Sequence, residues 1–197
     1  MGLKEDFSSL IDGIPKLMRE QYYYVITSLP YISLSEEPHI GRNDFLASCK
    51  NYLKRTDFEM LGSVSLFYAE EDDMPPGSIR RFFRWERGVR NVLVRLRAKS
   101  LGLEPDEFIR DEIVDHSQAL LAEEAFNANS PLMAEEILNK ARWRYLDELE
   151  FGHYFDIERL IVYFVKLQIL ERISSFDVEE GRERLNAIIS QGAPDTD

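Results

Sequence analysis

Two short motifs place a histidine near a carboxylate at helical spacing, an arrangement that metal-binding helices use. Glu150 and His153 form a Glu-x-x-His motif, and Glu112 lies four residues before His116. Di-iron carboxylate bundles need the Glu-x-x-His motif on two helices, together with two further inward glutamates. Here the one such motif on a predicted helix lies beside Gly152, at the helix end. The histidines are therefore interpreted as surface or capping residues, and no metal or other cofactor is predicted.

Other catalytic patterns are missing from the sequence. The segment Pro75-Pro-Gly-Ser78 lacks the lysine and the spacing of a phosphate-binding loop. No serine or cysteine lies in the context of a nucleophile elbow. Cys49 is the only cysteine, which excludes an internal disulfide and a zinc site built from several thiolates. The sequence thus predicts a protein that is not an enzyme.

Basic side chains are concentrated in one predicted helix, where Glu86 is the only carboxylate. One interpretation pairs most of them with the acidic segments 70–73 and 104–112. The other interpretation is a docking surface for an acidic partner protein. The basic residues, of which the last four are the candidate interface residues, are Arg80, Arg81, Arg84, Arg87, Arg90, Arg95, Arg97 and Lys99.

The overall charge limits the classes of partner. The formal net charge of the 197 residues is −12, which repels nucleic acids and anionic membranes. No nucleic-acid partner is predicted, although Phe82, Phe83 and Trp85 lie among the arginines. The first residues lack the basic-then-apolar pattern of a secretory signal, which favours a cytoplasmic protein.

The most apolar segment, residues 156–173, predicts the central helix of an all-α core. Asp156 is a suitable N-cap, and Ile157, Leu160, Ile161 and Phe164 follow at the spacing of one helical face. Apolar residues also cover the other faces, so this helix must be covered on several sides. Charged residues interrupt the run, which excludes a membrane span.

The helices before this one are predicted from their capping signals. Asn43 is expected to cap one helix, and Thr56 and Glu59 form a capping box that opens a second helix through about residue 69. Ser78 is expected to cap the basic helix. Residues 22–27 are ambiguous, because their aromatic and β-branched residues favour a strand.

The later boundaries are also marked by turn and capping residues. Gly102 is expected to end the basic helix, and Ser130-Pro131 to start a long helix that Gly152 ends. The short connection to Asp156 predicts an antiparallel pair. A helix is predicted at 3–20, a short helix from Pro105, a polar, acidic helix after it through about residue 126, and a last helix from Asp177.

The chain length suits one all-α domain, a multi-helix bundle at residues 1–190 with a flexible tail at 191–197. Val89, Val92, Leu93 and Leu96 repeat the spacing of the apolar face of the central helix. This faint repeat suggests two similar lobes, 21–103 and 104–190, although any two amphipathic helices share that spacing.

Several segments resemble the C (or d) subunit of V-type and A-type rotary ATPases. Residues 89–107, from Val89-Arg-Asn-Val to Gly-Leu-Glu-Pro-Asp-Glu107, look like the family segment Asn-Leu…Leu-Arg-x-Lys-x-x-Gly-Leu-x-x-Glu-Glu. The 156–172 helix resembles a later family helix. Residues 22–30 and 142–172 look closer still to uncharacterised bacterial proteins encoded beside V-type ATPase subunits.

The resemblance implies an all-α, subunit-C-like fold in which residues 22–27 are helical. It also implies a non-catalytic component of the central stalk, peripheral at the cytoplasmic face of the membrane. Its partners would be the rotor ring and the central shaft, in proton or sodium transport coupled to ATP hydrolysis or synthesis. The membrane would be contacted only indirectly, through the complex.

Two alternatives from other classes remain. One is a stand-alone helical adaptor or regulatory protein that binds an acidic partner through the basic helix. The other is a metal carboxylate enzyme that uses Glu112, His116, Glu150 and His153.

Overall fold

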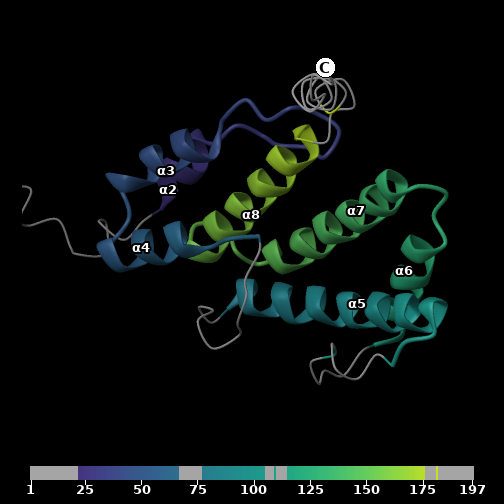
Figure 1. The fold of residues 1–197 in the computed structure, drawn as a ribbon. Helices are drawn as coiled ribbons and strands as arrows, with labels where there is room; N and C mark the ends of the chain where they lie inside the picture. The colour runs from purple at the N-terminus through teal and green to yellow at the C-terminus, as the bar shows by residue number, and fades with distance from the viewer. Residues whose placement is uncertain (1–21, 67–76, 105–108, 110–114, 176–180, 182–197) are drawn as a thin grey trace, which may run out of the picture.

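The computed structural model describes residues 22–66, 77–104, 109, 115–175 and 181. Throughout these ranges the regular structure is helical, without a strand, which confirms the all-α multi-helix prediction. Helix α8 lies in the middle, with α2, α3 and α4 on one side and α7 and α5 on the other (Figure 1). The helices are α2 (Tyr23–Ser28), α3 (Arg42–Lys50), α4 (Arg55–Ser63), α5 (Ser78–Leu101), α6 (His116–Phe126), α7 (Pro131–Glu150) and α8 (Ile157–Ser174).

Residues 22–27 are not a strand, so that alternative is wrong. They form the helix α2 and the turn before it, as the family resemblance implied. A strand needs a neighbour to satisfy its backbone groups, and none lies here, whereas one helical turn buries Val25 in the core. The hydroxyl of Tyr22 donates a hydrogen bond to Asp57, which ties this turn to α4.

The prediction of a central helix is confirmed by α8. Every residue from Leu160 to Leu170 is buried, on all sides of the helix. The carboxylate of Asp156 accepts a hydrogen bond from the backbone N–H of Arg159 at 3.1 Å, as an N-cap does. Helices α3, α4, α5 and α7 all pack against α8.

At the start of two helices, a carboxylate of α8 accepts a hydrogen bond from the backbone. The two caps predicted from the local sequence, Asn43 and Ser78, are therefore wrong. Helix α3 begins at Arg42, and its backbone N–H donates to Glu171 at 3.0 Å, so Asn43 is not the cap. Ser78 is the first residue of α5, and its N–H donates to Glu158 at 2.7 Å. A carboxylate from a distant helix satisfies each orphan donor in place of a local side chain.

Helix α8 also hydrogen-bonds two extended segments. The side chain of Gln168 donates to the carbonyl of Val64 at 3.0 Å and accepts from the N–H of Leu66 at 2.7 Å. The Tyr163 hydroxyl donates to the carbonyl of Pro30 at 2.9 Å. These bonds satisfy backbone groups that would otherwise be buried without partners.

The prediction for α4 was wrong at both ends. The helix begins at Arg55, and no side chain caps it. Glu59 does not close a capping box with Thr56, because its carboxylate accepts from Arg55 Nε at 2.7 Å instead. The helix ends at Ser63, earlier than predicted. The chain then continues in extended form through Val64 and Leu66, whose backbone groups bind Gln168.

The other predicted boundaries that fall on described residues are confirmed. Gly102 ends α5 in the left-handed conformation, with φ of 70°. The Ser130 side chain accepts from the N–H of Met133 at 3.2 Å, and Gly152 follows the end of α7 with φ of 87°. Helices α7 and α8 form the antiparallel pair (Figure 1). The predictions for 3–20, 105–108, 177–180 and 191–197 lie outside the described residues.

Two clusters of apolar side chains hold the helices together. The larger contains side chains of α2, α3, α4 and α8 with the first turns of α5 and the end of α7. The smaller joins the second half of α5 to α6 and the first half of α7. Helices α5 and α7 contribute to both clusters and so connect them. The division into two similar lobes at residue 103 stays a prediction.

Cys49 should be unreactive in the folded protein. Its side chain is fully buried in the larger cluster, and burial raises the pKa of the thiol to about 12. Alkylation requires the exposed thiolate, so we expect iodoacetamide at pH 8 to react about 100-fold more slowly with the native chain than with the chain in guanidinium. Mass spectrometry over time measures both rates, and similar rates would contradict the buried position.

Candidate functional site

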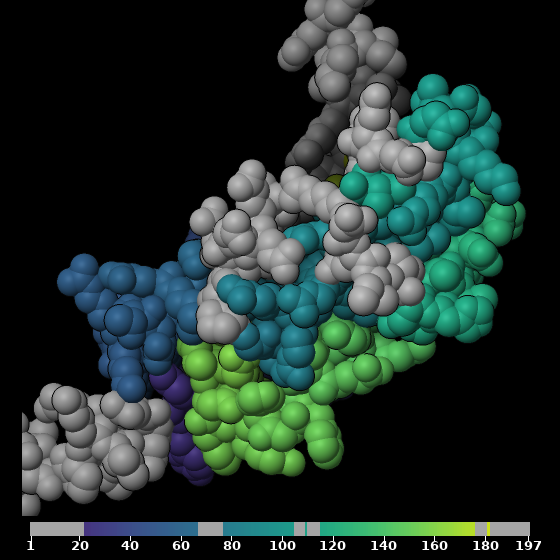
Figure 2. Space-filling model, turned by 90° about the horizontal axis from the view of Figure 1, so that it is seen from below, coloured from purple at the N-terminus to yellow at the C-terminus, as the bar shows by residue number. Residues whose placement is uncertain are grey.

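The candidate site is the surface of α5, which lies along one side of the bundle. Its ends are fixed by Glu158 at the first residue and by Gly102 at the last turn. One face packs on α6, α7 and α8, and the basic residues lie mainly on the rest. Seen from below, α5 runs across this side of the molecule from the N-terminal helices toward α6 (Figure 2).

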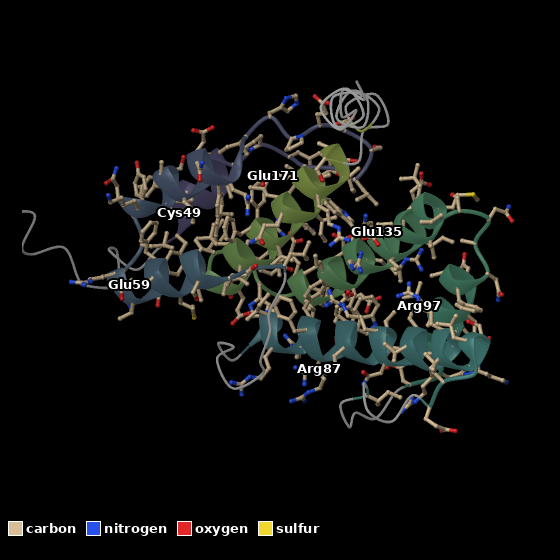
Figure 3. All side chains as sticks on the ribbon, in the orientation of Figure 1. Cys49, Glu59, Arg87, Arg97, Glu135 and Glu171 are labelled. Carbon is tan, nitrogen blue, oxygen red and sulfur yellow. The ribbon has the colours of Figure 1, made fainter. Side chains whose placement is uncertain are left out.

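The four candidate interface residues are all exposed, but they do not form one patch. An α-helix turns by about 100° per residue. Arg90 and Arg97 are seven residues apart and therefore lie within about 20° of each other. Arg95 and Lys99 are four residues apart and share another side of the helix. Figure 3 shows Arg97 on the side of α5 toward α7, while Arg87 points away from the bundle.

Arg90 belongs to an ion pair. Its Nε donates to the carboxylate of Glu86 at 2.9 Å, one helical turn away. Glu86 is only 4% exposed, and on its other side the guanidinium of Arg142 from α7 binds both carboxylate oxygens, at 2.9 and 3.1 Å. Such a two-pronged contact between planar groups is the strongest ion-pair geometry in proteins. Arg90 is thus partly committed to holding α5 against α7.

The network around Arg142 extends to a third helix. Its Nη1 donates to Asn139 at 2.7 Å and to Glu135 at 2.8 Å, both on α7. Glu135 also pairs with Arg172 of α8 at 3.1 Å. We call Glu86, Arg90, Glu135, Asn139, Arg142 and Arg172 the Arg142 network.

The charges in this network shift the pKa of its buried members. Burial alone would raise the pKa of Glu86, but the positive charges of Arg142 and Arg90 and their hydrogen bonds lower it below its usual value. Burial opposes the charge of Arg142 as well, and Glu86 and Glu135 overcome it and raise the pKa of the guanidinium. Both groups are therefore charged at neutral pH.

Sequence reasoning missed this network, although a signal for it existed. Glu86 follows Phe82 by four residues and precedes Val89 by three, so it lies on the buried face of α5. A single carboxylate on the apolar face of a basic helix needs a buried cation. Arg142 occupies the same kind of position, between Leu138 and Leu146 on α7.

The remaining basic residues of α5 fall into two groups. Arg80, Arg84 and Arg87, in the first half, each take part in an interaction, and Arg81 Nη2 donates to the Ser78 hydroxyl at 3.3 Å. Along the described segments, no ion pair involves Arg95, Arg97 or Lys99 in the last two turns. Asn91, between these two groups, is buried. Arg95, Arg97 and Lys99 thus form a group of exposed cations, without an ion pair in the described segments, at the C-terminal end of α5, where the helix dipole favours positive charge.

A second ion-pair cluster joins α7 to α8. Lys166 is buried and donates to Asp147 at 2.6 Å and to Glu150, which also pairs with Arg159. Burial lowers the pKa of Lys166, and the hydrogen bond and charge of Asp147 oppose that shift. The ammonium also lies 5.3 Å from the ring centroid of Trp143. This pairing cross-links the two helices near their common turn.

The described residues of the metal hypothesis do not form a metal site. Glu150 is held by Lys166 and Arg159, and His153 Nδ1 lies 2.6 Å from the carboxylate of Asp156. His116 is exposed at the start of α6, and Glu112 lies outside the described residues. In the part of the chain that the structure describes, no group of three or more His, Cys, Asp or Glu side chains could hold a metal ion.

None of the described helices combines the length and the apolar composition that crossing a bilayer requires.

Residues 56–192 match DUF2764, a family described as proteins of unknown function. No curated protein and no solved structure matches the chain. The matched region includes α5, α7 and α8 and therefore the whole Arg142 network. Since it spans more than half of the sequence, the chain belongs to the DUF2764 family.

Proposed function

We propose that the protein is a non-catalytic, subunit-C-like component of the central stalk of a V/A-type rotary ATPase. It would lie in the cytoplasm at the inner face of the membrane and link the rotor ring to the central shaft. Ion transport and ATP chemistry would take place in its partners. Such a component transmits force, so it needs a stiff body and surfaces for at least two partners.

The observation that carries the proposal is the way in which three helices are cross-linked. The Arg142 network ties α5 to α7 and α8 through buried, hydrogen-bonded charges. Lys166 adds a second tie between α7 and α8. Buried charge pairs tolerate little displacement, because separating them leaves a charge without a partner in an apolar interior. The resemblance of residues 89–107 and 156–172 to the ATPase subunit supplies the identity of the partners.

We assign the contact with one ATPase partner to the C-terminal end of α5. Arg95 and Lys99 are exposed, share one side of the helix and have no ion-pair partner in the described ranges. Opposite charges on a partner would steer association, and mutation of such exposed charges mainly affects the association rate. Arg97 lies on another side of the helix and is less suited to the same contact.

The test is co-purification from a cell that makes both this protein and a V/A-type ATPase. We expect the tagged chain to recover ATPase subunits. The double variant Arg95→Glu/Lys99→Glu should recover about tenfold less of these subunits than the wild-type chain. A matched control is Lys140→Glu/Arg144→Glu, an exposed cationic pair with the same four-residue spacing on α7. Recovery of no ATPase subunit, or an equal loss in both variants, would contradict the proposal.

The same experiment addresses the adaptor hypothesis. Exposed cations on a chain with a net charge of −12 favour an acidic partner of any kind. If Arg95→Glu/Lys99→Glu abolishes a complex that contains no ATPase subunit, the adaptor hypothesis replaces the first one. That complex should also weaken when salt is raised, because exposed charges are screened.

A further inference from the structure

The turn between α7 and α8 lies within a surface that is rich in exposed aromatic side chains. Phe151 in this turn is 86% exposed, and Tyr31 after α2 is 84% exposed. Large exposed aromatic side chains cost free energy unless something covers them. We call this surface the aromatic end, and its exposed residues are Tyr23, Tyr24, Tyr31, Tyr52, Phe151, Tyr154 and Phe155.

Ring contacts join four side chains of the aromatic end into one series. The ring centroid of Phe155 lies 5.0 Å from that of Tyr23, which lies 5.7 Å from Tyr24, and Tyr24 lies 6.4 Å from Tyr52. The series joins three segments that are far apart in the sequence. Figure 2 shows the purple residues of α2 beside the green residues of this part of the chain. Contiguous exposed apolar patches of this kind mark sites of association.

A cavity opens beside these rings. Its volume is about 240 Å³, and its apolar lining includes Ile26, Leu29 and Tyr31. Glu150 also lines it, together with the two cations that pair with this carboxylate, Arg159 and Lys166. An apolar cavity of about 150 Å³ is large enough to hold benzene. The cavity therefore has room for one large apolar side chain of a partner.

The charges next to the aromatic end are acidic on the α7 side. Asp147 and Glu148 are exposed on the last turn of α7, and the Asp147 side chain stays 55% exposed although it also binds Lys166. The C-terminus of α7 adds the negative end of its helix dipole. The net charge of −12 also repels an anionic lipid surface. The arrangement therefore suits a protein partner with cationic flanks better than a bilayer.

We propose that the aromatic end binds an amphipathic helix of a partner protein, with an apolar face flanked by lysine or arginine. The apolar face covers the rings and places one side chain in the cavity, while its cations meet Asp147 and Glu148. Arg95 lies 17 residues after Ser78, or about 25 Å along α5, and Ser78 contacts the first turn of α8. The aromatic end is therefore a separate surface from the cationic end of α5, and the proposal does not rest on the function proposed above.

The test uses two synthetic helical peptides of about 18 residues, or five turns, as probes. Both carry the same leucine and phenylalanine face, and one has lysine flanks and the other glutamate flanks. Fluorescence anisotropy with the full chain measures their affinities. We expect the lysine peptide to bind at least about tenfold more tightly than the glutamate peptide, because the flanks meet opposite charge.

Two sets of substitutions locate the binding surface. Replacing three rings of the aromatic end should weaken the lysine peptide about tenfold or more, because aromatic anchors dominate such interfaces. The control replaces three exposed apolar residues of α6 and α7 and should leave the affinity unchanged. All six side chains are exposed, and unchanged urea denaturation checks that both variants fold. The test variant is Tyr24→Ser/Phe151→Ser/Phe155→Ser, and the control is Leu120→Ser/Phe126→Ser/Leu132→Ser.

Five results would overturn the proposal. Equal affinity for the two peptides, or equal loss in the two variants, would remove the specific surface. Binding to phosphatidylserine vesicles that needs the aromatic rings would make the occupant a membrane. A dimer that the ring substitutions dissociate would make it a second copy of this chain. Peptide binding that appears only after Leu10→Glu/Ile14→Glu would make it the chain's own first residues.

Discussion

Replacing Arg142 by methionine should lower the free energy of unfolding by about 3–5 kcal/mol. The substitution leaves Glu86 buried with Arg90 as its remaining ion-pair partner and removes the cross-link between α5 and α7. Urea denaturation measures the loss. The matched control is Arg55→Met, because Arg55 forms an exposed pair with Glu59 and its loss should cost less than about 1 kcal/mol.

A double variant distinguishes the loss of the ion pair from the loss of packing contacts between α5 and α7. In the double variant Glu86→Leu/Arg142→Met no carboxylate is left at position 86, and an apolar contact replaces the pair. We expect the double variant to recover most of the lost stability, because isosteric apolar pairs often match buried ion pairs. If Arg142→Met costs no more than Arg55→Met, the network does not hold the helices together.

Glu86 should also make the free energy of unfolding depend on pH. Because its folded-state pKa is lowered, Glu86 adds stability that is present above the pKa of the unfolded chain, about 4.5. That stability is lost as the pH falls through the lowered folded-state value. The difference between the wild-type protein and Glu86→Gln should therefore be largest near neutral pH and shrink in acid.

The second large effect is expected at Phe45. This side chain is 0% exposed, and its ring stacks on Tyr163 and Phe164 of α8 with centroids 5.3 and 5.4 Å apart. Phe45→Ala should destabilise the protein by about 3–5 kcal/mol, from lost burial and the cavity that remains. Urea denaturation gives the value, and Phe126→Ala, at an exposed ring on α6, should cost less than about 1 kcal/mol.

Alkylation of Cys49 provides an independent readout of the same change. Cys49 lies one turn after Phe45 on α3 and is buried in the same cluster. If α3 opens more often in Phe45→Ala, the thiol should react faster in proportion to the lost stability. An unchanged reaction rate would mean that contacts other than those of Phe45 hold α3 in place.

The elements that depend on local sequence were predicted well. The apolar run of α8, the Ser130-Pro131 start of α7 and the glycine end of α5 all lie where their own residues indicate. Helices α2 and α4 are exceptions. The six residues of α2 have strand-like composition, and only the surrounding packing makes them helical. The capping box predicted at the start of α4 does not form.

The elements that depend on distant residues were not predicted. The starts of α3 and α5 are satisfied by Glu171 and Glu158, which are 129 and 80 residues away in the sequence. No local pattern around Asn43 or Ser78 reveals this. In the candidate site, the exposure of the α5 cations could be predicted from helical periodicity. Their division into two sides and the ion pair of Arg90 became visible only in the structure.

The position of α8 in the sequence has a consequence for synthesis on the ribosome. Its side chains complete the polar contacts of four earlier segments, at Pro30, Arg42, residues 64–66 and Ser78. During translation these segments leave the exit tunnel long before residues 158–171 do. Their backbone groups therefore lack these hydrogen-bond partners until α8 emerges. The nascent chain should gain protease resistance late and in one step.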